Sequence, residues 1–159
     1  MTRLPFFCLL LVAGPALAAD LLFARGRWAA LHHGGTCEAV ARPLAPASER
    51  EPQARAGFTF DAARRGGFHV RLSRPPRPGS SVLLKVGQQP FLLVVHGPWA
   101  WSGGPLQDRA IIAAVRRERA MRVEGRAADG RRFSDLYPLD GAPTAIDAAA
   151  AACAGKIQP

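Results

Sequence analysis

The clearest alternation of hydrophobic and polar positions lies in the last third of the chain, where it predicts a helix, two strands and a closing helix. Ile111, Ile112 and Val115 form one apolar stripe of a helix over 108–118. Asp108 is the expected N-cap of this helix, because its carboxylate can accept from the free amides of the first turn. The arginines that follow the stripe suit the negative end of the helix dipole.

After this helix the period of the pattern changes to that of a strand. From Met121 onward apolar residues alternate with charged ones, which predicts a strand with one buried face. The dipeptide Asp129-Gly130 is typical of a tight hairpin turn. Asp135 and Tyr137 then share the apolar face of the return strand, so the carboxylate is expected to be paired inside the fold.

The closing helix is expected over 142–153. Pro143 falls in its first turn, where the missing N–H costs nothing. Ile146 and Cys153 lie on one face at helical spacing, so Cys153 is expected to point to the core.

The preceding part of the chain carries shorter apolar segments separated by glycine- and proline-rich turns, which predicts strands. These strands are expected at 21–31, 36–40, 57–61, 68–72, 82–86 and 91–95. The last one is apolar on both sides, so we expect a central strand that is covered on both faces. Residues 41–56 are rich in proline, alanine and charge, which predicts a mobile surface loop.

Two tryptophans lie in the glycine- and proline-broken segment 97–105, which predicts a loop. Trp99 and Trp101 either form an aromatic binding platform or plug the open end of the core, and the second reading is favoured because buried aromatic rings dominate core energetics. Together the elements predict a mainly β domain, an antiparallel β-sandwich or bent sheet with two helices packed on it.

The start of the chain has the three parts of a secretory signal peptide. Arg3 precedes an apolar run over 4–12, and a small-residue cleavage site ends at Ala18. The run is too short for a bilayer span of about 20 residues. We therefore expect cleavage to leave 19–159 as one soluble domain, periplasmic or secreted, without a transmembrane segment.

Export changes how the three cysteines are interpreted. Cys8 would leave with the signal peptide, so Cys37 and Cys153 remain as an even pair in an oxidising compartment. We expect them to form a disulfide rather than two buried free thiols. Nothing resembles the C-x-x-C motif of a catalytic redox pair.

The chain is strongly basic, with a formal net charge of +9. Loss of Arg3 with the leader would leave 20 basic against 12 acidic side chains, a net charge of +8. The arginines are scattered, and export argues against nucleic acid as a partner. The charge therefore indicates at most a weak attraction to an anionic envelope surface.

Candidate chemistry is sparse. The chain has four histidines, namely His32, His33, His69 and His96. They lack the spacing of metal ligands, and no phosphate-binding glycine motif is present. Acid–base work by Asp135 and Tyr137 would need a pocket that also gathers a histidine. We therefore expect no catalytic residues, cofactor or metal.

Several motifs within 81–153 carry a resemblance to a known family. The motif D-x-A-I-I-A-A-V-R begins at Asp108, and D-L-Y-P-L-x-G-A-P-T-A-I-D-A-A precedes Cys153, with Gly141 and Ile146 in matching places. In this order they resemble the exported alphaproteobacterial proteins of the invasion-associated locus B type. The resemblance implies a periplasmic or secreted, non-enzymatic β-rich domain, and some members are associated with entry into host cells.

The function expected from this resemblance is binding to a protein or to the envelope. The candidate surface comprises Trp99, Trp101, Arg122, Arg126 and Arg131. An alternative is a small inhibitor or accessory domain that docks on another envelope protein through the Trp99–Trp101 loop. A third reading, an enzyme, requires the pocket described above.

Overall fold

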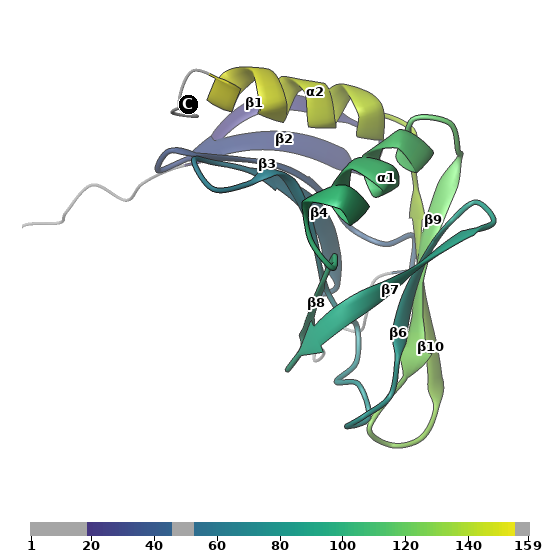
Figure 1. Cartoon of the computed structure of the whole chain (residues 1–159). Coiled ribbons are helices and arrows are strands. Elements are labelled where there is room, and N and C mark those ends of the chain that lie inside the picture. The colour runs from purple at the N-terminus through teal and green to yellow at the C-terminus, as the bar shows by residue number, and fades with distance from the viewer. Residues whose placement is uncertain (1–18, 46–52, 155–159) are drawn as a thin grey trace, which may run out of the picture.

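The computed structural model describes residues 19–45 and 53–154. They form ten strands and two helices (Figure 1). In chain order these are β1 (Asp20–Arg25), β2 (Trp28–His33), β3 (Thr36–Ala41), β4 (Arg55–Phe60), β5 (Arg65–Arg71), β6 (Val82–Val86), β7 (Gln89–His96), β8 (Trp99–Trp101), α1 (Pro105–Val115), β9 (Ala120–Arg126), β10 (Arg132–Pro138) and α2 (Ala142–Cys153).

All ten strands belong to one antiparallel sheet with the order β1-β2-β3-β4-β5-β8-β7-β6-β9-β10. The first five strands form a meander in chain order, whereas β6, β7 and β8 are laid down in reverse. Figure 1 shows the sheet strongly bent, with α2 over β1 to β3 and α1 between the two halves. The predicted class, a mainly β bent sheet with two helices, is therefore confirmed.

Both helices cover the same face of the sheet, called here the inner face. Alternate residues of each strand point to it, and they form the core with the buried sides of the helices. Its largest fully buried side chains include Trp28, Phe58, Phe68, Leu72, Leu84, Ile111, Met121, Tyr137 and Ile146. α2 contributes mostly alanines, which let it pack closely on the strands.

The two ends of the bent sheet contact each other at one corner. The Trp28 indole N–H donates to the Pro138 carbonyl at 2.8 Å, and the Leu44 amide donates to the Leu136 carbonyl at 2.7 Å. Gly141 fits this junction because it adopts a φ of 88° and a Cβ there would lie 2.6 Å from the Arg25 carbonyl oxygen. Through the Leu44 amide, the loop that follows β3 contacts β10.

The disulfide between Cys37 and Cys153 is present, with a Cα–Cα distance of 5.9 Å. It joins β3 to the last residue of α2 across a sequence separation of 116. Both cysteines are fully buried. The predicted pairing, and the prediction that Cys153 faces the core, are confirmed.

Several element boundaries differ from expectation. The expected strand 21–31 is two strands, because Gly26 turns the chain with a φ of 60°. α1 begins at Pro105 rather than at Asp108, with Gly104 as its N-cap, and it ends at Val115 before the arginines. The ends of the expected loop 41–56 belong to strands, since β3 includes Ala41 and β4 begins at Arg55, and residues 46–52 of that loop lie outside the described residues.

The Trp99–Trp101 segment is a strand and not a loop. Its three residues pair with Val94–His96 of β7 on one side and with His69–Arg71 of β5 on the other. β8 therefore joins the two halves of the sheet. The local pattern hides it because glycine and proline flank a very short strand.

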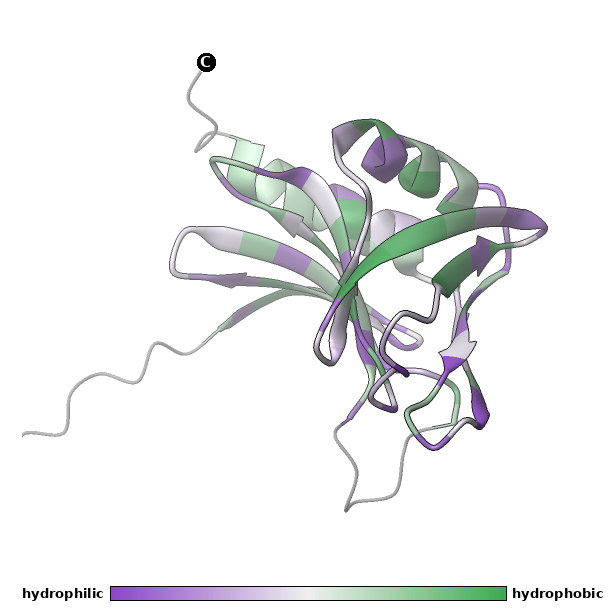
Figure 2. Ribbon diagram, turned by 60° about the horizontal axis from the view of Figure 1, so that its bottom comes forward, coloured by the Kyte–Doolittle hydropathy of each residue, from purple (hydrophilic) through white to green (hydrophobic). Residues whose placement is uncertain are grey.

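β7 is interior to the sheet but is not covered on both faces. Phe91 and Leu93 are buried on the inner face, whereas Leu92 and Val94 are 59% and 58% exposed on the outer face. Figure 2 shows the middle of this strand, residues 91–95, as a hydrophobic stretch with hydrophilic ends. The expectation of a doubly covered strand is wrong, because both helices lie on one side.

The predicted signal peptide and Cys8 lie outside the described residues. Within the described part of the chain, neither helix combines the length and the apolar character that a membrane span requires.

Candidate functional site

The outer face of β4 and β5 carries polar side chains that are buried although no helix lies over them. Thr59 and His69 are only 2% and 5% exposed, and their strand neighbours Phe58 and Phe68 point to the inner face. The side chains beside them provide the cover, among them the ring of Trp99, whose centroid lies 6.1 Å from that of His69. A buried polar group needs a partner, which makes this cluster a candidate site.

A chain of polar contacts runs from Glu38 through Thr59 to His69. The Thr59 hydroxyl lies 3.2 Å from Glu38 Oε1 and 3.2 Å from His69 Nδ1. Because a carboxylate can only accept, Thr59 donates to Glu38 and accepts from His69. The neutral imidazole therefore carries its proton on Nδ1 and its lone pair on Nε2. Nε2 is buried without a hydrogen bond among the described residues, 3.9 Å from Glu38 Oε1.

Gly57 provides the space for this imidazole. A Cβ at Gly57 would lie 2.9 Å from both Cε1 and Nε2 of His69. The two residues are directly opposite in the pairing of β4 with β5. The missing side chain thus leaves room for the ring over Gly57, and burial there lowers the pKa of His69 more strongly than nearby Glu38 raises it.

We expect His69 to make the protein less stable as the pH falls. Its pKa in the folded state is lowered from 6.5, so below that value the unfolded chain takes up the proton first. Stability is therefore fully present above pH 6.5 and is lost as the pH falls towards the lowered pKa. Urea unfolding at a series of pH values should show a flatter profile for His69→Gln.

The exposed residue His96 provides the matched control. His96→Gln should keep the pH profile of the unsubstituted protein. A His69→Gln profile as steep as that of the unsubstituted protein would remove His69 as the titrating group.

The two tryptophans lie beside this cluster on the outer face. Their ring centroids are 6.3 Å apart with 25° between the planes, and the Arg55 guanidinium lies 5.3 Å from the Trp99 centroid. Ala100 between them is fully buried on the inner face. Both rings are half-buried on the outer face, so neither plugs the core as was favoured, and a binding role for the pair stays a prediction.

A cavity of about 560 Å³ opens next to Trp101, where the β4–β5 turn meets the start of α1. Its lining includes Arg64, Arg65 and Arg109, together with His69. Arg64 is engaged by Asp61 at 2.6 Å. No hydrogen bond or ion pair joins the side chains of Arg65 and Arg109 to another residue of the described ranges, so the cavity presents two cations that a ligand could neutralise.

Asp108 lines this cavity rather than capping its helix. Its Oδ1 accepts the Phe68 amide at 2.8 Å and also the Ser102 hydroxyl. Gln107, one residue earlier, donates to the Leu92 carbonyl at 3.1 Å. The first turn of α1 thus provides hydrogen-bond partners for backbone groups of β5 and β7 that lie beyond the end of the short β8. These bonds hold the cavity wall in place.

The three arginines of the candidate surface lie elsewhere. Arg122 and Arg126 are on β9, and Arg131 is in the turn that follows. Arg126 donates to the Gly130 carbonyl at 2.8 Å, and Arg122 contacts Glu124 at 3.8 Å. In the sheet order β7 and β6 stand between them and the tryptophans, so the structure does not bring the two groups together.

Asp135 and Tyr137 lie on the inner face, as expected. Asp135 Oδ2 accepts the Ser73 amide at 3.3 Å, and burial raises the pKa of this carboxyl. Burial also raises the pKa of Tyr137, whose hydroxyl has no hydrogen bond among the described residues. The buried histidine of the described chain, His69, lies on the other face of the sheet, so it does not join them.

Comparison with models of known protein families, with curated proteins and with solved structures found no match for this chain.

Proposed function

We propose that this protein is a non-enzymatic, exported binding domain that docks on an acidic surface of a partner protein. The observation that carries the proposal is the pairing of Trp101 with Val94 on the outer face, beside the cavity that contains Arg65 and Arg109. The docking face is defined here as Leu92, Val94, Trp101, Arg65 and Arg109.

The composition of the docking face fits a protein partner. Leu92 and Val94 are more than half exposed and adjoin Trp101, which forms an apolar centre. Aromatic and apolar centres with a charged rim are typical of protein interfaces, and Trp and Arg dominate their binding energy. Because the rim cations lack partners among the described residues, acidic side chains are the chemistry that complements them.

Export is supported by the leader pattern, by the disulfide and by the resemblance to the invasion-associated locus B proteins. A disulfide persists in an oxidising compartment such as the periplasm or the extracellular space. The net charge adds a weak attraction towards an anionic envelope. An inhibitor or accessory domain would use the same face, and loss of an enzymatic activity of the captured partner would favour that alternative.

The test is photo-crosslinking in the cells that natively produce the protein. A photoreactive amino acid at Val94 should give a specific adduct, whereas one at Thr144, which is exposed on α2, should not. In the variant that carries the photoreactive amino acid at Val94, the further substitutions Arg65→Glu and Arg109→Glu should reduce the adduct by roughly tenfold or more, because like charges then meet at the rim. No adduct, or equal adducts at both positions, would contradict the proposal.

A further inference from the structure

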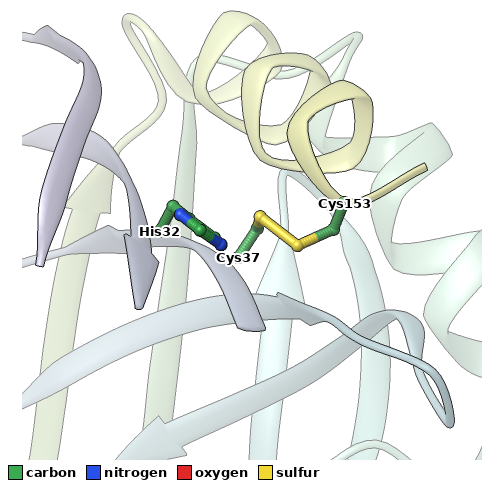
Figure 3. Close-up of side chains that lie close together, drawn as sticks. All are labelled: His32, Cys37 and Cys153. Atoms are coloured by element: carbon green, nitrogen blue, oxygen red, sulfur yellow. A yellow bond between two sulfur atoms is a disulfide. The ribbon is translucent and has the colours of Figure 1, made fainter. Parts of the chain in front are cut away.

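The disulfide has a histidine beside it. Figure 3 shows the imidazole of His32 pointing to the bond between Cys37 and Cys153. One ligand atom from each of the three residues lies within 4.8 Å of the other two. Two sulfurs and an imidazole nitrogen are a common set of ligands for zinc.

The fold brings this cluster together from three elements that are far apart in sequence. His32 and Cys37 are directly opposite in the pairing of β2 with β3, so they share one face of the sheet. Cys153 approaches the same face from the last turn of α2. The cysteines are fully buried, whereas the side chain of His32 is 29% exposed, which leaves the site open to solvent on the histidine side.

A carboxylate on the neighbouring strand β1 lies beside the His32 imidazole. Asp20 pairs with His32 across β1 and β2, and its Oδ2 lies 3.6 Å from His32 Nδ1. A carboxylate beside one ring nitrogen orients metal-bound histidines in many proteins and makes the other nitrogen a better ligand. The cluster therefore has an outer group of the kind that accompanies zinc sites.

We propose that Cys37, Cys153 and His32 bind a thiophilic divalent cation such as Zn²⁺ once the disulfide has been reduced. A tetrahedral zinc ion, with bonds of about 2.3 Å to sulfur and 2.0–2.1 Å to nitrogen, holds these atoms about 3.5–3.8 Å apart. The imidazole has to approach by at most about 1.3 Å, the difference between 4.8 Å and that spacing. Water takes the fourth position.

The disulfide and the metal ion exclude each other because they use the same sulfur atoms. Opening the bond takes two electrons and two protons from a dithiol reductant, which becomes a disulfide itself. The cation then displaces the two thiol protons and binds the thiolates. In the reduced protein the ion replaces the covalent link between β3 and α2.

The test uses the full mature chain, reduced with a dithiol and freed of reductant under anaerobic conditions. Cd²⁺ is the probe, because its bonds to thiolates give an ultraviolet charge-transfer band. We expect one ion per reduced chain and no band for the oxidised protein. His32→Ala should weaken binding by about tenfold or more, and Asp20→Asn by about tenfold, as outer partners do at zinc sites.

The neighbouring residue His33 provides the matched control, since it is exposed at the end of the same strand. His33→Ala should bind Cd²⁺ as the unsubstituted protein does. If the reduced chain unfolds, Cd²⁺ or Zn²⁺ should restore its far-ultraviolet circular dichroism spectrum. Equal affinities for His32→Ala and His33→Ala, or no band and no recovery of structure, would overturn the proposal.

Discussion

Replacing Cys37 and Cys153 together with alanine is expected to lower the free energy of unfolding by about 4–5 kcal/mol. The bond closes a loop with a sequence separation of 116. Without it the unfolded chain regains the conformational entropy that the cross-link removes. Urea unfolding should show the loss, and the melting temperature should fall by roughly 10–20 °C.

Reduction supplies the control for this substitution. A dithiol reductant with a metal chelator should destabilise the unsubstituted protein by a similar amount and should leave the double variant unchanged. The chelator prevents a metal ion from restoring the link between β3 (Thr36–Ala41) and α2 (Ala142–Cys153). A loss below about 1 kcal/mol, far from the value for so long a loop, would contradict the prediction.

Trp28→Ala is expected to cost about 3–5 kcal/mol of stability, the range for truncating a buried large aromatic side chain. The side chain is 1% exposed, and its ring stacks on Phe58 with centroids 6.1 Å apart. It also donates the 2.8 Å hydrogen bond to Pro138 that joins the first strands to the end of β10. Denaturant unfolding at neutral pH measures the loss.

Trp28→Phe separates the hydrogen bond from the packing. Phenylalanine keeps most of the apolar contact but leaves the Pro138 carbonyl without its donor, which costs about 1–3 kcal/mol. Trp101→Phe on the half-buried outer face should change stability by only about 0.5 kcal/mol. Equal effects at both positions would show that the Trp28 contact between β2 and the end of β10 adds no special stability.

The sequence predicts best those elements whose pattern is local and strongly periodic. The hairpin of β9 and β10 follows from alternation around Asp129-Gly130, and α2 follows from its apolar stripe and Pro143. β8 could not be predicted, because its three residues are a strand only through partners on β5 and β7. Its glycine- and proline-rich flanks point to a loop instead.

The candidate site was predicted only in part. The tryptophans were singled out, but the arginines beside them were not, because the β4–β5 turn and α1 reach Trp101 only in the folded chain. The polar contacts from Glu38 through Thr59 to His69 link three strands that are separate in sequence. The sequence signal for this cluster is weak, because each of its three residues is simply a polar position on the outer side of an alternating strand.

The disulfide was predictable for a different reason. It follows from the even count of cysteines that remains once the expected signal peptide is set aside, and from the helical face of Cys153. His32 was not linked to it, because two adjacent histidines before a turn carry no metal-ligand spacing. Only the pairing of β2 with β3 places His32 opposite Cys37.

The cover that α2 gives to β1, β2 and β3 has a consequence for the order of folding during synthesis. β1, β2 and β3 bury their inner face against α2, which is synthesised after all ten described strands. These three strands therefore keep an exposed apolar face until α2 has been synthesised. Contacts between segments so far apart in sequence form slowly, so we expect the apolar face of these strands to be covered late in folding.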